Sequence, residues 1–348
     1  MSTCAFVSFR LGLTDGVSIV TGAWRRCFER SGWYTYTVAG EGPVDVTVEG
    51  LAIDAPHPPA ADAVAAALAA ADLVVVENLL SIPLNLGASR AVAAALRGRP
   101  AVLHHHDPPW QRARFAHVTE LPPDDAAWLH VTINRFTAAE MADRGLAATP
   151  IYNGFDPDEP PGDRTGVRTM LGLDPATPLV LHPVRAIARK NVPAAVAVAE
   201  MVDGVYWLPG PAEEDYADEL ERIVAAARCD VVRTTPGELG PGLTMPDLYA
   251  AADLVAFPST WEGFGNPPIE AAIHRRPVVV GHYPASDELR ELGFRWLDPG
   301  DQAAIRRAVI RPPVADMEHN RRLVADHLSI DGMCRRVNSL LERAGLSP

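Results

Sequence analysis

The feature that most constrains the fold is an alternation between short apolar runs and segments with helical periodicity, repeated along the whole chain. Strands that alternate with helices predict a doubly wound, largely parallel α/β sheet. The apolar runs predicted as strands lie at 5–9, 34–39, 44–51, 73–77, 101–107, 130–133, 179–182, 205–208, 231–233, 254–257 and 278–280. The segments predicted as helices end at 30, 97 and 145 or span 60–70, 247–251, 284–293, 314–327 and 329–344, with another beginning near 192.

The chain has 348 residues, enough for two domains of about 150 residues each. A single α/β barrel also fits this length. The segment 157–166 is rich in Pro, Gly and Asp, which is typical of a linker. We therefore expect a first domain at 1–156 and a second that begins at residue 157.

Charge and composition limit the partners. The formal net charge of −13 argues against a nucleic-acid binder and against an anionic membrane surface. The first 25 residues lack a basic start with an apolar core, and no stretch of about 18 residues is apolar and uncharged. These observations predict a soluble, cytoplasmic protein. The four cysteines show no paired spacing, so reduced thiols are expected at Cys4, Cys27, Cys229 and Cys334.

The stretch from Pro258 to Ala272 contains more residues of the types that bind ligands than any other segment of the same length. It follows an apolar run and enters a helical segment, and such junctions at the carboxyl ends of parallel strands bind ligands in open α/β sheets. Gly263 and Gly265 allow the backbone to approach a ligand closely. Glu262 and Glu270 flank them; the alternative is one solvated glutamate and one favourable charge at a helix start.

These residues resemble the E-x7-E signature of retaining glycosyltransferases with the GT-B fold, most closely family 4. The resemblance implies two Rossmann-like domains that face each other across a cleft. The first would bind the acceptor, and the second, 157–328, the nucleotide sugar. The segment 329–348 would be a helix that crosses back to the first domain. Donor binding would fall on Glu262, Gly263, Phe264, Gly265, Asn266 and Glu270.

The segment from Arg185 to Lys190 resembles the R-x4-K motif of the same family, whose arginine and lysine reach the donor diphosphate. Lys190 is the single lysine among 31 basic residues, which hints that this position needs a compact point charge. The alternative is a basic loop in solvent. Asn191 is expected to cap the helix that follows.

Three adjacent histidines, His104 to His106, suggest a metal site. On a strand only His104 and His106 share a face, and no cysteine or carboxylate with ligand spacing accompanies them, so no metal is expected. His106-Asp107 resembles the family's His-Asp motif, which implies contact with the donor sugar and the reacting centre. The alternative is a histidine that caps the strand end by hydrogen bonding.

Two loops are candidates for acceptor contacts. By resemblance, the glycine loop after the first strand lies beside the donor diphosphate and the acceptor, and Gly16, Val17 and Ser18 occupy that place. A plain connection is the alternative, because a lone glycine is a weak signal. The irregular segment 108–123 carries Trp110 and Arg112, which we expect near the acceptor with Asp107.

Together these features predict a retaining, metal-independent glycosyltransferase without a cofactor, which moves a hexosyl group from a UDP- or GDP-linked sugar to a small soluble acceptor. The residues expected to act in catalysis are His106, Arg185, Lys190 and Glu262. A glycoside phosphorylase of the same fold and a non-catalytic nucleotide-sugar binding protein are the alternatives.

Overall fold

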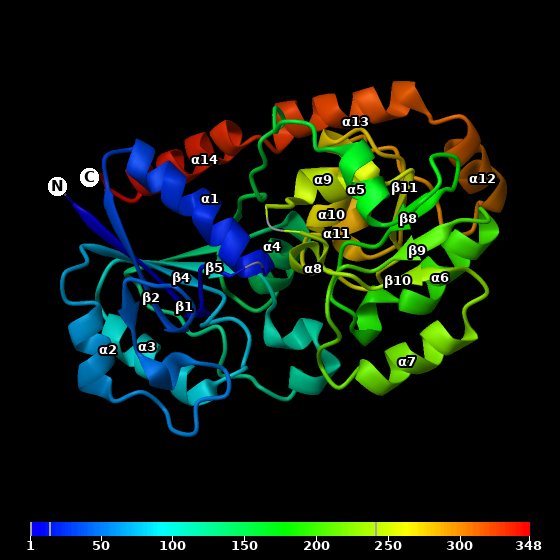
Figure 1. Ribbon diagram of the computed structural model, residues 1–348. Helices are drawn as coiled ribbons and strands as arrows, with labels where there is room; N and C mark the ends of the chain where they lie inside the picture. The colour runs from blue at the N-terminus through cyan, green and yellow to red at the C-terminus, as the bar shows by residue number, and fades with distance from the viewer. Residues whose placement is uncertain (1, 14, 241) are drawn as a thin grey trace. The chain divides into compact units, whose positions relative to one another are not determined.

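The computed structural model describes residues 2–13, 15–240 and 242–348. Three residues lie outside the described ones: Met1, Thr14 and Pro241. All three fall within the predicted domains, and Thr14 also belongs to the predicted glycine loop. The chain divides into two compact units (Figure 1). Unit 1 comprises Met1–Gly154 and Leu328–Pro348, and unit 2 comprises Phe155–His327.

Unit 1 contains a parallel seven-stranded sheet in the order β3-β2-β1-β4-β5-β6-β7. Alternate residues of β1 enter two cores: Cys4 and Phe6 face one side, and Ala5 and Val7 the other. This alternation follows from the two-residue period of a strand that is buried on both faces. The strands are β1 (Thr3–Arg10), β2 (Tyr34–Glu41), β3 (Val46–Thr47), β4 (Leu73–Glu77), β5 (Ala101–His105), β6 (Trp128–Thr132) and β7 (Ala148–Pro150).

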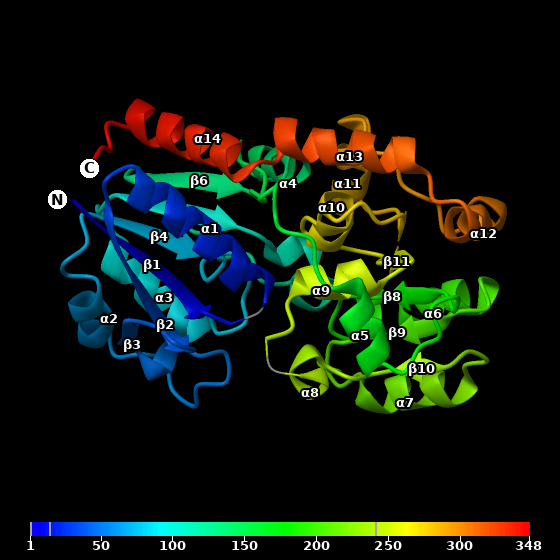
Figure 2. The ribbon, with the colours of Figure 1, turned by 45° about the horizontal axis from the view of Figure 1, so that its top comes forward.

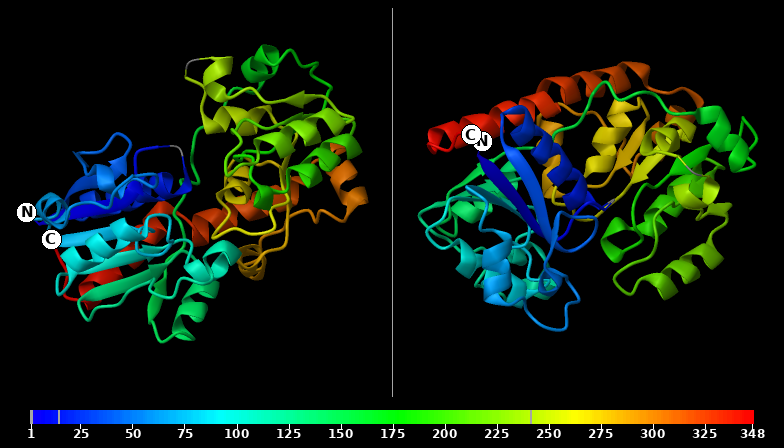
Figure 3. Two further views of the ribbon diagram at one scale, coloured as in Figure 1. Left: turned by 90° about the horizontal axis from the view of Figure 1, so that it is seen from below. Right: turned by 60° about the vertical axis from the view of Figure 1, so that its left-hand side comes forward.

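Helices cover both faces of this sheet. Residues of α1 and α14 line one core, and residues of α2 and α3 line the other (Figure 2). Figure 3 shows α14, in red, alongside α1, in blue, although the two are far apart in sequence. The helices of unit 1 are α1 (Gly16–Arg30), α2 (Ala61–Ala67), α3 (Leu86–Leu96), α4 (Arg135–Ala142) and α14 (Ile330–Arg343), with 3-10 turns at Glu49–Leu51, Pro109–Gln111 and Ala113–Phe115.

A disulfide joins α1 to α14 through Cys27 and Cys334. The expectation of four reduced thiols is therefore wrong for this pair, whereas Cys4 and Cys229 are free. The two partners are 307 residues apart, so their spacing in the sequence carries no sign of the pairing.

Unit 2 contains a parallel five-stranded sheet in the order β10-β9-β8-β11-β12. Its strands are β8 (Leu179–Leu181), β9 (Val205–Trp207), β10 (Val231–Val232), β11 (Leu254–Phe257) and β12 (Val278–Val280). Its helices are α5 (Arg164–Met170), α6 (Val192–Met201), α7 (Ala217–Ala226), α8 (Pro236–Leu239), α9 (Met245–Ala251), α10 (Asn266–Ile273), α11 (Pro284–Glu291), α12 (Gln302–Ile310) and α13 (Val314–His327), with a 3-10 turn at Ala188–Lys190.

The predicted elements differ from the structure mainly at short segments. The run 44–51 forms only the two-residue strand β3 and a 3-10 turn, and Gly50 in that turn packs so closely on Pro59 that a Cβ would lie 2.4 Å from its backbone. The short elements β7 and α12 were not predicted. In the described part of the chain no helix has the length and apolar character to cross a membrane.

Candidate functional site

In unit 2 the loops after β8 and β11 lie together, because these strands are parallel neighbours and end at the same edge of the sheet. Two hydrogen bonds join the loops. The amide of Thr260 donates to the carbonyl of Arg189 at 2.9 Å, and Asn191 Nδ2 donates to the carbonyl of Pro258 at 3.3 Å. Asn191 has a left-handed backbone and makes no side-chain cap, so the capping expected of it is wrong.

Glu262 lies at the centre of this loop pair and is 7% exposed. Its carboxylate accepts a hydrogen bond from Lys190 Nζ at 2.6 Å and pairs with Arg189 on its other oxygen. Burial opposes ionisation of Glu262, but the charges of Lys190 and Arg189 outweigh it and hold the pKa of the carboxyl below its usual value. Glu262 is therefore an anion held by two cations.

Lys190 is more deeply buried than the arginines near it, and its side chain is 12% exposed. Burial lowers the pKa of Lys190 to about 8, although the attraction of Glu262 opposes the shift. The ammonium also lies 5.0 Å from the centre of the Phe257 ring. Arg185, in contrast, pairs with Glu213 and has a side chain that is 36% exposed.

The glycine loop leads directly into α10. Gly265 precedes the first residue of the helix, Asn266, and has φ +94°, a left-handed conformation that favours glycine. A Cβ here would lie 2.3 Å from the hydroxyl oxygen of Tyr283. Phe264 is buried and stacks on Phe155 at 6.2 Å, whereas the backbone of Gly263 remains half-buried. The loop is thus shaped for a close approach of its backbone.

Glu270 is the fifth residue of α10, in the second turn of the helix. Its carboxylate accepts a 2.6 Å hydrogen bond from the hydroxyl of Tyr249. Burial raises the pKa of Glu270, the Tyr249 hydrogen bond opposes the shift, and the negative charge of Glu159 adds to it. Its surroundings therefore differ from those of Glu262, which has two cations.

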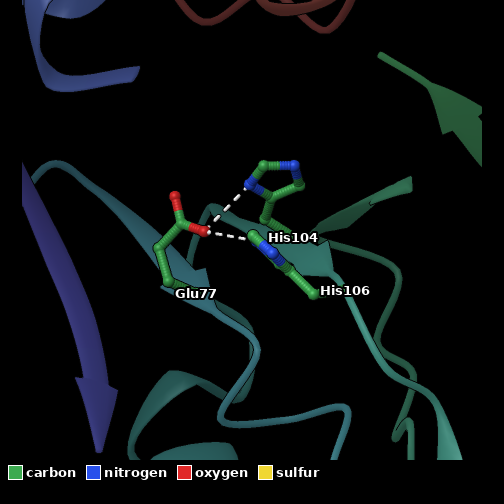
Figure 4. A group of neighbouring side chains, drawn as sticks. All are labelled: Glu77, His104 and His106. Atoms are coloured by element: carbon green, nitrogen blue, oxygen red, sulfur yellow. Dashed lines mark hydrogen bonds and ion pairs between the residues drawn. The ribbon is translucent and has the colours of Figure 1, made fainter. Parts of the chain in front are cut away.

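In unit 1, His104 and His106 lie on one face of the chain at the end of β5, as the two-residue period predicts. Both rings contact Glu77, the last residue of β4 (Figure 4). His104 Nδ1 lies 2.9 Å and His106 Nε2 3.1 Å from the same carboxylate oxygen, Oε2. The expectation that no carboxylate would accompany the histidines is wrong, because the neighbouring strand supplies one.

This group is the one set of residues in the described chain whose ligand atoms could hold a metal ion. Burial alone would raise the pKa of Glu77, but hydrogen bonds and charge interactions with the two rings lower it. Burial lowers the pKa of His104. The Glu77 carboxylate is therefore held ionised by the rings of His104 and His106.

His105 points to the opposite face of the sheet and belongs to a different network. Its Nδ1 lies 2.5 Å from the hydroxyl of Ser81, and its Nε2 lies 2.9 Å from Nδ1 of His130. His130 Nε2 in turn lies 3.1 Å from Asp124. His105 is therefore separate from the Glu77 group.

The remaining predicted residues of unit 1 have partners within the unit. The amides of Val17 and Ser18 both donate to the side chain of Asp15, which caps α1, and a Cβ at Gly16 would have open space around it. Arg112 pairs with Asp107 at 2.6 Å.

Trp110 donates from Nε1 to Glu140 at 3.0 Å, and the guanidinium of Arg144 lies 4.1 Å from the centre of its ring. A hollow of about 1050 Å³ in unit 1 contains none of the predicted site residues. It is lined mainly by the segment 45–60, together with alanines of α2 and the first residues of β1 and β2.

Two residues of these groups were missed from the sequence. Glu77 closes an apolar strand, and Arg189 stands one position before Lys190. A charged residue at the last position of a buried strand was the available signal for Glu77, because parallel strand ends meet at one edge. Arg189 could have been recognised only as a second cation next to the predicted one.

Two parallel-sheet α/β units with these loops at their strand ends define the GT-B fold. Residues 187–311 match the family model described as Glycosyl transferases group 1. Together the family match and the similar structures support the conclusion that the chain is a glycosyltransferase with the GT-B fold.

Particular proteins similar to the chain include two mannosylglucosylglycerate synthases. That of Petrotoga mobilis is 26% identical over 290 residues, which cover 69% of this chain and 66% of the relative. That of Thermotoga maritima is 24% identical over 374 residues, which cover 88% and 87%. The solved structure of Anabaena Alr3699/HepE in complex with UDP-glucose has a TM-score of 0.69 and 17% identity, and covers 99% of this chain and 100% of that one.

Proposed function

We propose that the protein is a retaining glycosyltransferase that moves a hexosyl group from a nucleotide sugar, UDP- or GDP-linked, to a small soluble acceptor. The observation that carries the proposal is the buried cluster of Lys190, Arg189 and Glu262 beside the glycine loop of unit 2. Support also comes from the group 1 match over residues 187–311, and from relatives named mannosylglucosylglycerate synthase and, in Rhizobium meliloti, lipopolysaccharide core biosynthesis mannosyltransferase.

Departure of the nucleotide requires stabilisation of the charge that develops on its diphosphate. Lys190 and Arg185 supply positive charge at the end of β8, and the backbone from Gly263 to Asn266 lies at the start of α10. Such a constellation acts by electrostatic preorganisation, without a metal on the diphosphate. In this proposal no cofactor takes part in the transfer.

The glutamates orient the donor. Glu262 binds hydroxyls of the transferred sugar, and Glu270 binds the ribose, where it is already held by Tyr249. His106 of unit 1 contacts the donor sugar, and Gly16 lies beside its diphosphate. The acceptor binds unit 1 near Val17, Ser18, Asp107, Trp110 and Arg112. Departure and attack occur on the same face of the sugar, and a phosphate oxygen of the donor takes the acceptor's proton.

The experiment has two stages. A thermal-shift panel of UDP-, GDP-, ADP- and dTDP-sugars first identifies the donor, because a ligand that binds the folded state raises its stability. Turnover is then measured for Arg185→Ala and Lys190→Ala, with Arg228→Ala as control. Arg228 pairs with Glu200 and has an 84% exposed side chain.

Loss of a preorganised donor costs about 2.7–4 kcal/mol of activation free energy, so the two site variants should turn over at least a hundredfold more slowly. The Arg228 control should match the wild type. Near-normal turnover in both site variants would refute the proposal. Release of sugar 1-phosphate on addition of phosphate would instead show a phosphorylase, and binding without nucleotide release a non-catalytic protein.

We also propose a cytoplasmic location. The net charge of −13 supports it, because an acidic protein is not drawn to anionic membranes. Disulfides such as Cys27–Cys334 are rare in a reducing cytoplasm, so this bond counts against the location. Four titratable thiols in protein taken from the native host would support a cytoplasmic location, and two would contradict it.

A further inference from the structure

Glu77 is a buried carboxylate without a permanent cation as partner. It is 0% exposed, and both of its ion pairs in the described part of the chain are with histidines, His104 and His106. Removing a carboxylate from water is costly unless a positive charge compensates it. The group therefore has a strong electrostatic demand for a cation at this position.

The ligand atoms converge on a common point. His104 Nδ1 and His106 Nε2 lie 2.9 and 3.1 Å from Glu77 Oε2, and the three atoms all lie within 4.8 Å of one another. Figure 4 shows both rings next to the carboxylate, from the ends of two neighbouring strands. Bonds of about 2.0–2.2 Å to a tetrahedral ion place its ligand atoms about 3.3–3.6 Å apart. The two N–O spacings lie a few tenths of an ångström below this range, so a small movement of the side chains admits the ion.

Two polar atoms of the group have no protein partner in the part of the chain that the structure describes. Both rings contact the same carboxylate oxygen, and Glu77 Oε1 and His104 Nε2 are buried without a hydrogen-bond partner among the described residues. Buried polar atoms of native proteins are nearly always partnered. The second carboxylate oxygen is therefore available to a ligand.

We propose that Glu77, His104 and His106 form a binding site for one divalent transition-metal ion of the zinc type. Two imidazoles and a carboxylate select such an ion over Mg²⁺ and Ca²⁺, which prefer oxygen ligands. Three protein ligands leave a fourth coordination position for water. The site lies in unit 1, and the transfer proposed above places no ion on the diphosphate.

The test measures metal binding directly, because His106 also belongs to the proposed function and turnover alone would not separate the two. Full-length protein is stripped with EDTA and dialysed, and Zn²⁺ is titrated in competition with a chromophoric chelator. Co²⁺ is titrated separately and its visible absorption recorded. Wild type should bind one equivalent of each ion, and Mg²⁺ should not compete.

Glu77→Gln and His104→Gln should weaken Zn²⁺ binding by at least about tenfold to a hundredfold, because the loss of even an outer partner of a metal ligand has that effect. His105→Gln is the matched control. His105 is as buried as His104 and lies on the same strand, but it faces the other side of the sheet, where Ser81 and His130 are its hydrogen-bonding neighbours. This variant should bind Zn²⁺ like the wild type.

No uptake of Zn²⁺ or Co²⁺ by wild type, or equal losses in His104→Gln and His105→Gln, would overturn the proposal in favour of a hydrogen-bonded triad. If the variants fail to fold, NMR of wild type with Co²⁺ decides: the imidazole signals of His104 and His106 must shift far more than that of His105. Nucleotide-sugar binding, measured on the same samples, reports separately on the proposed function.

Discussion

Raising the pH through 8 should weaken binding of the donor nucleotide, because Lys190 loses its charge there. Burial lowers the pKa of this lysine from its usual 10.5 to about 8. At 1.36 kcal/mol per unit the folded protein disfavours the charged form by about 3 kcal/mol. The free site therefore holds a full ammonium at pH 6–7 and almost none at pH 10.

The size of the effect is that of one charge-assisted hydrogen bond between Lys190 and the diphosphate. A hydrogen bond to a charged group contributes about 1.5–3 kcal/mol, and 1.4 kcal/mol is a factor of ten. The dissociation constant of the nucleoside diphosphate, measured by calorimetry from pH 6.5 to 10, should rise by about ten- to a hundredfold above pH 8 and then level off. Binding of the diphosphate raises the pKa of Lys190 by the corresponding one to two units.

Lys190→Arg is the control, because a guanidinium stays charged over this range. The dissociation constant of this variant should be nearly constant between pH 7.5 and 10. Any change that it still shows measures the titration of the ligand's own phosphates, which can then be subtracted from the wild-type curve. Lys190→Met should bind at pH 7 about as weakly as wild type does at pH 10. The same rise in wild type and Lys190→Arg, or none in either, would refute the role given to this lysine.

Three other outcomes are expected. Glu262→Gln leaves Lys190 and Arg189 without their carboxylate and should lower the free energy of unfolding in urea by about 3 kcal/mol at pH 7. The double variant with Lys190→Met should recover part of this loss. An unchanged stability of Glu262→Gln would contradict the buried cluster. Gly265→Ala, which meets both a positive φ and the Tyr283 hydroxyl, should lose about 1–3 kcal/mol of stability and bind the donor more weakly, whereas Gly237→Ala, with open space around its Cβ, should change stability by less than about 0.5 kcal/mol. Reduction of Cys27–Cys334 should lower stability by about 2–4 kcal/mol and raise the thiols titrated in denaturant from two to four; four thiols before reduction would show that the disulfide is absent.

The sequence was most informative where a periodic pattern was long and buried on both faces. The bounds of β4, β11 and β12 agree with the predicted runs to the residue, because fully buried parallel strands are continuous apolar segments. It was least informative for the run 44–51, where only Val46–Thr47 forms a strand, paired with β2. How far one strand pairs with another depends on residues outside the local pattern.

The candidate site divides in the same way. The sequence identified Lys190, Glu262 and the glycine loop as chemically distinctive, and the two-residue period placed His104 and His106 on one face. It could not show that Arg189 shares Glu262 with Lys190, because that interaction joins loops more than 70 residues apart.

By itself, then, the sequence determined the alternation of strands and helices, the parallel sheets that follow from it, and the residue types available at the strand ends. Only the tertiary structure decided which of these residues meet: Glu77 with two histidines from the next strand, Glu262 with two cations, and Cys27 with Cys334. The physical reason is that periodicity and propensity act over a few residues, whereas ion pairs, metal ligands and disulfides depend on the order of strands in a sheet and the packing of helices on it.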